Sequence, residues 1–169
     1  RLKPQHEVAV IEMGANHQKE IAFLSSIVEP THGLITNIGK AHLEGFGGLE
    51  GVFKGKTELY DFMKSQGGKL FVNSRNERLV EKAKMSVGHE AVMTYPDEGD
   101  TFEASLVESE PQVVFNVDAR KAIKTQLSGV YNFENLCAAL CIGKHFEVPL
   151  SRGIEAVSEY VPENNRSQI

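Results

Sequence analysis

The fold is decided by residues 33–73, which read GLITNIGKAHLEGFGGLEGVFKGKTELYDFMKSQGGKLFVN. This stretch begins with a short apolar run, GLITN at 33–37, and ends with a second one, KLFVN at 69–73. Between the two runs, residues 49–63 place apolar side chains at helical spacing, and Gly67-Gly68 interrupts that pattern. Two buried strands joined by a helix pair in parallel through a right-handed crossover. The stretch therefore predicts a strand-helix-strand unit.

The same alternation extends on both sides of this unit. EVAVIE at 7–12 has the β-branched composition of a buried parallel strand, and residues 19–28 have helical spacing that ends before Pro30. Downstream, residues 77–84 predict another helix and residues 91–95 another strand. We therefore expect an α/β fold with a doubly wound, mostly parallel sheet that is flanked by helices.

The pattern changes from Thr101 onward. Three short segments separated by polar turns predict a small antiparallel meander attached to the main sheet. They are residues 102–107, 113–117 and 122–127. A long apolar helix is expected over residues 131–145, and Ser151 is the expected N-cap of a last helix that continues to Tyr160.

Length and composition indicate a single globular domain. The chain has 169 residues, 41% hydrophobic and 24% charged, which excludes a disordered or fibrous protein. We expect residues 1–161 to form one domain and residues 162–169 to be a linker towards a further domain. Cys137 and Cys141 lie four residues apart in a predicted helix, a spacing typical of buried core residues rather than redox-active thiols.

Charge and hydropathy exclude several classes of partner. The net charge is −5 and no basic cluster is present, which argues against nucleic-acid binding. No apolar run approaches the ~20 residues that a membrane span needs, so we expect no membrane insertion. Because the N-terminal residues also lack the features of a signal peptide, we expect a cytoplasmic protein.

Two residues at the ends of neighbouring predicted strands are candidate metal ligands. Glu12 ends an otherwise apolar strand, and His42 lies in a glycine-flanked loop after the next strand. Taken singly, each residue is more often a solvated strand end or a surface side chain. Because the carboxyl ends of parallel strands meet at one edge of a sheet, the two side chains can converge on a divalent cation.

Lys56 imitates the end of a phosphate-binding loop, since Gly55-Lys56-Thr57 matches the last part of G-x-x-x-x-G-K-[ST]. The first glycine of that motif would stand at position 50, which is Glu50. The stretch also lies inside a predicted helix, where the backbone N–H groups are already used in helical hydrogen bonds. We therefore reject a phosphate loop at this position.

Three motifs together resemble the central domain of the Mur ligases. They are EMGANH at 12–17, TNIGKAHLEGFGGLEGVFKGK at 36–56 and GVYNFENLCAAL at 129–140. Within that family the chain is most similar to the ligases that add D-alanyl-D-alanine to a UDP-linked muramoyl tripeptide. The resemblance implies an ATP-dependent ligase of peptidoglycan synthesis that forms an amide through an acyl phosphate.

The resemblance also implies a magnesium site. Glu12 and His42 match the residues that help to hold Mg²⁺ in the family, and Lys56 matches a lysine whose side-chain nitrogen is carbamylated. A carbamate is an anion, so it can stabilise the cation that an ammonium group would repel. These three residues are the expected catalytic and metal-binding set.

Nucleotide and substrate contacts are implied in the same way. The residues that match family positions at the adenine, ribose and phosphates of ATP are Asn132, Asn135 and Arg166. The residues expected beside the substrate are Asn16, His17 and Asn37. The positions that depart from residues common in the family are Gly48, Thr57 and Tyr131. These departures affect details of the adenine contacts and of the loop geometry, but they leave the expected metal residues in place.

The phosphate loop that normally precedes EMGANH in this family is not in the sequence, so we expect the 169 residues alone to have little or no ligase activity. Two alternatives stay open. One is a related ligase, such as another Mur ligase or folylpolyglutamate synthase. The other is a non-catalytic α/β binding module, which would bind a nucleotide or partner without dependence on a metal.

Overall fold

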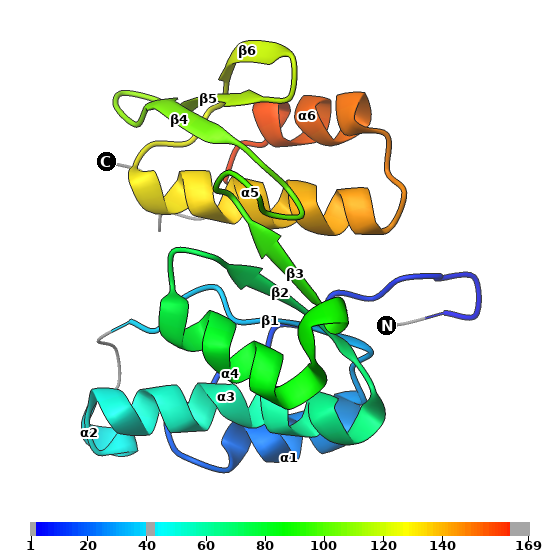
Figure 1. Ribbon diagram of the computed structural model, residues 1–169, viewed down its shortest axis with the longest axis vertical. Helices are drawn as coiled ribbons and strands as arrows, with labels where there is room; N and C mark the ends of the chain where they lie inside the picture. Colours follow the sequence, from blue (N-terminus) through cyan, green and yellow to red (C-terminus); the bar gives the residue numbers. More distant parts are fainter. Residues whose placement is uncertain (1–2, 40–42, 163–169) are drawn as a thin grey trace.

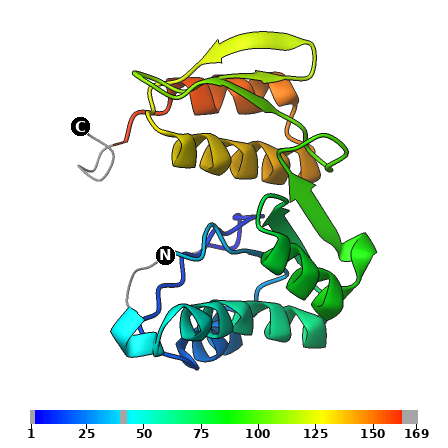
Figure 2. The same ribbon diagram turned by 60° about the vertical axis from the view of Figure 1, so that its left-hand side comes forward.

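The computed structural model describes residues 3–39 and 43–162 and has an α/β fold (Figures 1 and 2). The helices are α1 (Glu20–Val28), α2 (Leu43–Phe46), α3 (Leu49–Gln66), α4 (Glu77–Val87), α5 (Val130–His145) and α6 (Leu150–Glu159), with a 3-10 turn, η1, at His89–Ala91. The strands are β1 (His32–Leu34), β2 (Lys69–Asn73), β3 (Val92–Tyr95), β4 (Ser105–Glu108), β5 (Val114–Val117) and β6 (Arg120–Lys124).

A parallel sheet in the order β1-β2-β3 forms the centre of the molecule. In its register, Phe71 of β2 pairs with Leu34 on one side and with Met93 on the other. Helices α1, α3 and α4 lie on one face of this sheet and α5 lies on the other (Figures 1 and 2). The expected doubly wound parallel sheet with flanking helices is confirmed.

The parallel sheet separates two hydrophobic cores. Side chains alternate between the faces of a strand, so Leu70 and Val72 of β2 point towards the helices while Phe71 points towards α5. The first core, between the sheet and α1, α3 and α4, includes Ile21, Leu59, Tyr60, Met63 and Leu79. The second core, around α5, includes Tyr95, Phe115, Phe133, Leu136 and Cys137.

The antiparallel strands form a sheet of their own, in the order β4-β5-β6. The expectation that they attach to the parallel sheet is wrong, because no ladder joins the two sheets among the described residues. Helix α5 lies between the two sheets, and Phe115 of β5 packs against Phe133 of α5 with ring centroids 6.3 Å apart. Side-chain packing on α5, together with backbone hydrogen bonds from Phe102 to Thr94 and from Ala104 to Pro96 just before β4, therefore connects the meander to the rest of the protein.

Residues 7–12 do not form the expected strand. No ladder among the described residues includes them, and an extended segment without a ladder is not a β-strand. Val10 in this segment is 91% exposed, so the burial expected of a parallel strand is also wrong. The expected strand at 33–37 is found one residue earlier and is shorter, since β1 ends at Leu34.

Other expected elements are confirmed with adjusted ends. Helix α4 continues to Val87, and its N-cap Asn76 accepts a hydrogen bond from the backbone N–H of Leu79 at 3.2 Å. Helix α6 begins at Leu150 after Pro149, so the expectation of Ser151 as its N-cap is wrong. The backbone oxygen of Pro149 accepts hydrogen bonds from the N–H groups of Arg152 (2.8 Å) and Gly153 (3.1 Å), so the helix starts directly after Pro149.

Both cysteines are buried in α5, as expected, and burial raises the pKa of each thiol to about 12. Thiols with such a pKa stay protonated and unreactive at neutral pH. Among the described residues, no helix combines the length and the apolar character that crossing a membrane would require.

Candidate functional site

The EMGANH segment is held in place by the carboxylate of Glu20, the first residue of α1. Glu20 accepts hydrogen bonds from the backbone N–H groups of Asn16 (2.6 Å) and His17 (3.1 Å), and its second oxygen lies 3.3 Å from Nδ1 of His17. The two backbone hydrogen bonds lower the pKa of Glu20. This arrangement fixes the backbone at Asn16 and His17, two expected substrate residues, while both side chains stay exposed.

A second carboxylate fastens the start of α1, which follows the EMGANH segment, to α3. Glu58 accepts hydrogen bonds from the backbone N–H groups of Lys19 (2.6 Å) and Ala22 (3.0 Å). The first N–H groups of a helix have no partner within the helix, and the residue before α1, Lys19, provides no side-chain cap. Glu58 therefore caps α1 from α3 and sets the distance between the two helices.

Residues 43–47 of the HLEGFG segment pack directly on the EMGANH segment. Glycines allow the two backbones to come this close. A Cβ atom at Gly45 would lie 2.4 Å from the carbonyl oxygen of Asn16, and one at Gly51 would lie 1.7 Å from the carbonyl oxygen of Phe46. Gln18 adds a hydrogen bond from its Nε2 to the same Phe46 oxygen at 3.4 Å. The two motifs singled out in the sequence are thus in contact.

Lys56 lies in the middle of α3. Its Nζ donates a hydrogen bond to the backbone oxygen of Asn37 at 2.8 Å, so the structure brings these two expected site residues together. The side chain is partly buried, and burial lowers the pKa of the amine. Because Gly55, Lys56 and Thr57 are all helical, the rejection of a phosphate loop here is confirmed.

The structure describes only one of the other two expected metal residues, Glu12 and His42. Glu12 is an exposed residue in an extended segment, and its neighbour Met13 packs against the first core, as does Ile38 next to Asn37. His42 lies outside the described residues, and so does Arg166. Within residues 3–39 and 43–162, no three His, Cys, Asp or Glu side chains form a ready metal cluster. The magnesium site therefore stays a prediction.

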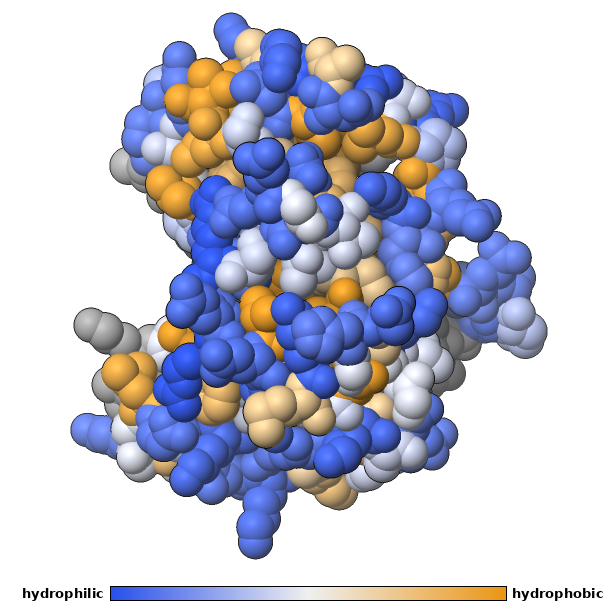
Figure 3. Space-filling model, in the orientation of Figure 1, coloured by the Kyte–Doolittle hydropathy of each residue, from blue (hydrophilic) through white to orange (hydrophobic). Residues whose placement is uncertain are grey.

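A small cavity of about 200 Å³ opens at the carboxyl ends of the parallel strands. Its lining residues are Thr36, Asn37, Asn73, Arg75, Asn76, Leu79 and Glu134. The surface is hollowed on the side towards which the strands point, between the lower helices and α5 (Figures 1 and 3). Ligands of doubly wound sheets collect at this edge.

We call this small cavity the strand-end cavity. Arg75 forms one of its walls and is held by two kinds of contact. Its guanidinium donates to Asp97 at 2.8 Å and lies 5.6 Å from the centroid of the Phe133 ring. The hydrogen bonds to Asp97 are the main reason that the pKa of Arg75 is raised. Sequence reasoning missed Arg75, Asn73 and Glu134. One signal was available in the sequence. Asn73 is a polar residue at the end of a buried strand, and Asn37 likewise follows the end of a strand.

Asn132 and Asn135, the expected nucleotide residues, differ in their surroundings. Asn132 is buried in the first turn of α5 and donates a hydrogen bond to the backbone oxygen of Ser128 at 2.6 Å. Asn135 is exposed. Glu134, between them, lines the strand-end cavity. Neither asparagine lines the cavity, and the side chain of Asn132 is engaged at the start of the helix, so the nucleotide contacts of this pair stay a prediction.

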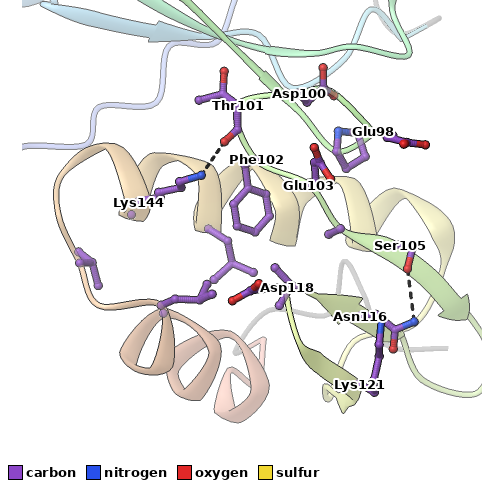
Figure 4. Close-up of a pocket in the computed structure, with 18 of the residues that line it drawn as sticks. Glu98, Asp100, Thr101, Phe102, Glu103, Ser105, Asn116, Asp118, Lys121 and Lys144 are labelled. Atoms are coloured by element: carbon purple, nitrogen blue, oxygen red, sulfur yellow. Dashed lines mark hydrogen bonds between the residues drawn. The ribbon is translucent and has the colours of Figure 1, made fainter.

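A larger cavity of about 820 Å³ lies elsewhere, between the antiparallel sheet, the end of α5 and the start of α6 (Figure 4). Acidic residues such as Glu98, Asp100 and Asp118 line it together with Lys144, whose Nζ donates to the backbone oxygen of Thr101 at 2.8 Å. None of the described candidate residues lines this cavity. The candidate site is therefore the smaller, polar cavity at the carboxyl ends of the parallel strands.

Comparison with known protein sequences identifies relatives of the chain. A family model described as the Mur ligase middle domain matches residues 1–143. UDP-N-acetylmuramoyl-tripeptide–D-alanyl-D-alanine ligase of Haemophilus influenzae is 46% identical over 79 residues, which are 47% of this chain and 17% of that protein. The enzyme of the same name from Synechocystis is 30% identical over 143 residues, which are 85% of this chain and 30% of that protein.

Solved structures agree with the sequence comparison. A crystal structure of MurF from Acinetobacter baumannii superposes with a TM-score of 0.81 at 28% identity, and the match covers 98% of this chain and 37% of that one. MurF from Thermotoga maritima in complex with ADP has the same fold, with a TM-score of 0.72 at 21% identity, and is covered to 36%. The chain thus spans about a third of the length of these structures. With its parallel sheet, its two contacting motif loops and a family match over residues 1–143, the chain belongs to the Mur ligase family, as a middle domain.

Proposed function

We propose that this chain is the ATP-handling part of a ligase that adds D-alanyl-D-alanine to UDP-N-acetylmuramoyl-tripeptide in peptidoglycan synthesis. The observations that support this most are the contact of Gly45 with Asn16, which joins the two motif segments, and the hydrogen bond from Lys56 to Asn37. Because the chain spans 37% of the Acinetobacter structure, the activity is proposed for the whole natural protein. Residues 1–161 would form its central domain, residues 162–169 would be the linker that follows, and the cytoplasm would be its location.

The proposed magnesium site consists of Glu12, His42 and carbamylated Lys56. The surroundings of Lys56 suit the modification, because the lowered pKa raises the share of neutral amine and only the neutral amine reacts with carbon dioxide. A carbamate keeps one N–H on Nζ, so the hydrogen bond to the Asn37 oxygen can persist. The bound cation would supply charge neutralisation between the phosphates of ATP and the substrate carboxylate.

The residues of the chain would bind and orient the reactants. Asn132, Asn135 and Arg166 are proposed to contact ATP, and the exposed Asn16 and His17 to contact the muramoyl peptide near Asn37. In the reaction, the peptide carboxylate takes the terminal phosphoryl group of ATP, and the dipeptide amine then attacks the acyl phosphate. Phosphate leaves and an amide bond forms. Both steps depend chiefly on positioning and on neutralised charge.

The experiment measures phosphate release by the whole natural protein with ATP, Mg²⁺, the UDP-linked tripeptide and D-alanyl-D-alanine. We expect release to require all four, and to fall about a hundredfold in Glu12→Ala, because the variant removes a charge that holds the cation. Glu103→Ala is the matched control, since Glu103 is exposed in the lining of the larger cavity. Full activity of Glu12→Ala would contradict the proposed site.

Two further results would replace the proposed function. Preference for a free amino acid over the dipeptide, in a panel of acceptors, would indicate a related ligase of the same fold. Nucleotide binding that is independent of Mg²⁺, without phosphate release, would indicate a non-catalytic binding module.

A further inference from the structure

Two histidines meet at the edge of the parallel sheet opposite to the strand-end cavity. His32 is the first residue of β1, and His145 is the last residue of α5. Their Nε2 atoms are 3.0 Å apart although 113 positions separate them in the sequence. Because Asn37 and the candidate site follow the other end of β1, this pair is distinct from that site.

The surroundings of the pair fix which nitrogen atoms face each other. Nδ1 of His32 lies 2.9 Å from the hydroxyl of Thr31, which leaves Nε2 of His32 directed at His145. The His32 ring packs against Phe71 and Phe146, with centroids 6.1 and 4.9 Å away. Metal-binding histidines commonly have such a polar partner on the second nitrogen, since it orients the ring.

The two imidazoles are in the form that binds metals. Burial is the main cause that lowers the pKa of both His32 and His145, with a contribution from the nearby Lys69. Both rings are therefore neutral at pH 7, and neutral imidazole is the ligating form. Both side chains remain partly exposed, so water can complete a coordination shell.

The charges near the two histidines have opposing effects on the binding of a cation. The ammonium group of Lys69 opposes a cation, whereas the C-terminal end of α5, where His145 lies, favours one through the helix dipole. Mg²⁺ and Ca²⁺ prefer oxygen ligands, so a site of two nitrogens selects a borderline transition-metal ion. Two Zn–N bonds of about 2.0–2.1 Å at a tetrahedral angle place the nitrogens about 3.3 Å apart.

The geometry points to a binding site for a divalent transition-metal ion, with Zn²⁺ as the probe, held by Nε2 of His32 and Nε2 of His145 and completed by water. An opening of a few tenths of an ångström from the observed 3.0 Å admits the ion. Bound there, the ion joins β1 to α5 and so connects the parallel sheet to the helix that covers one of its faces.

Calorimetric titration of Zn²⁺ into the 169-residue chain at pH 7.5, in the presence of Mg²⁺, tests this site. We expect one zinc ion per chain, and about a tenfold or greater loss of affinity in His32→Gln and in His145→Gln. The control variant is His89→Gln, at an exposed histidine in η1, and it should bind as the parent does. Unchanged affinity in the double variant His32→Gln/His145→Gln, or no zinc binding by the parent chain, would overturn the proposal.

A second measurement keeps the test valid if the variants lose stability. With Cu²⁺ as the probe, electron paramagnetic resonance of the unaltered chain should show coupling to two imidazole nitrogens. Saturating Zn²⁺ at a hundredfold excess over Kd should raise the Tm of the parent by about 5 °C and leave that of a folded variant unchanged. Coupling to a single nitrogen, or a spectrum dominated by oxygen ligands, would exclude the pair as the site.

Discussion

The two faces of the parallel sheet are organised by different kinds of contact. On the face of α1, α3 and α4, backbone lies against backbone at glycines that leave no room for a side chain, as Gly51 does against Phe46. On the face of α5, large apolar side chains fill the space between the two sheets. The difference teaches that the first face, in addition to its own hydrophobic core, places loops through close backbone contacts, whereas the second holds the antiparallel sheet in place through side-chain packing. Lys56, one of the candidate metal residues, lies on α3 of the first face.

The largest expected effect concerns the chemistry of Lys56. In the whole natural protein, Lys56→Ala should lower ATP-dependent amide formation by a hundredfold to a thousandfold, about the loss seen when one group that stabilises developing charge is removed. Lys56→Arg should lose as much, because a guanidinium keeps the positive charge but does not form the carbamate.

The matched control is Lys54→Ala, an exposed lysine on the same helix, which should keep full activity in the same assay. Removal of dissolved carbon dioxide should also lower the activity, and bicarbonate should restore it. If Lys56→Arg stays active, Lys56 acts as a cation and the carbamate proposal is wrong.

Glycine-to-alanine substitutions separate the two faces directly. In Gly51→Ala the new Cβ would collide with the Phe46 carbonyl, so the free energy of unfolding should fall by about 2 kcal/mol. In Gly143→Ala of α5, the nearest atom to the new Cβ is Cβ of Val148 at 3.7 Å, an ordinary contact. That variant should gain up to about 1 kcal/mol from helix propensity. Urea unfolding of both variants measures the difference, and equal effects would contradict the comparison.

Buried hydroxyl groups offer a second contrast. Oγ1 of Thr125, near the second core, donates to the oxygen of Val113 and accepts from the N–H of Leu127, both at 3.2 Å. Thr125→Val leaves that buried N–H unpaired and should lower the free energy of unfolding by about 1.5 kcal/mol. The Tyr60 hydroxyl, in the first core, has no partner among the described residues, and burial raises its pKa.

Tyr60→Phe should therefore leave the free energy of unfolding unchanged or raise it, within about 1 kcal/mol, because it removes a buried oxygen that makes no hydrogen bond. Thermal unfolding of the two variants side by side checks the sign. A destabilised Tyr60→Phe would mean that the hydroxyl has a partner, such as an ordered water.

The smallest expected effects distinguish the two asparagines of α5. Asn132→Ala removes the 2.6 Å hydrogen bond to Ser128 and should lower the free energy of unfolding by about 1 kcal/mol. Asn135→Ala, at an exposed position, should leave stability unchanged and weaken ATP binding by the whole natural protein. Calorimetry of unfolding and of nucleotide binding separates the two outcomes. Equal loss of stability in both variants would assign Asn135 a structural role instead.

Much of the fold could be predicted because strands and helices follow local patterns. The apolar run of β2 and the helical spacing of α3 are properties of a few consecutive residues, so residues 69–73 and 49–63 were placed correctly. The same reasoning failed at residues 7–12, where an apolar, β-branched run forms no strand. A strand requires a partner alongside it, and composition says nothing about whether one is present.

The candidate site divides in the same way. The identities of Glu12, His42 and Lys56 and their order along the chain come from the sequence, because motif spacing is a property of the chain. Three roles come from the tertiary structure: that of Glu20, which holds the EMGANH backbone, that of Glu58, which caps α1, and that of Arg75 at the strand-end cavity. Hydrogen bonds between residues such as Lys19 and Glu58, 39 positions apart, form only when packing has brought two helices together. The identity of the site residues can therefore be read from the chain. The contacts that orient these residues depend on which distant segments fold against each other.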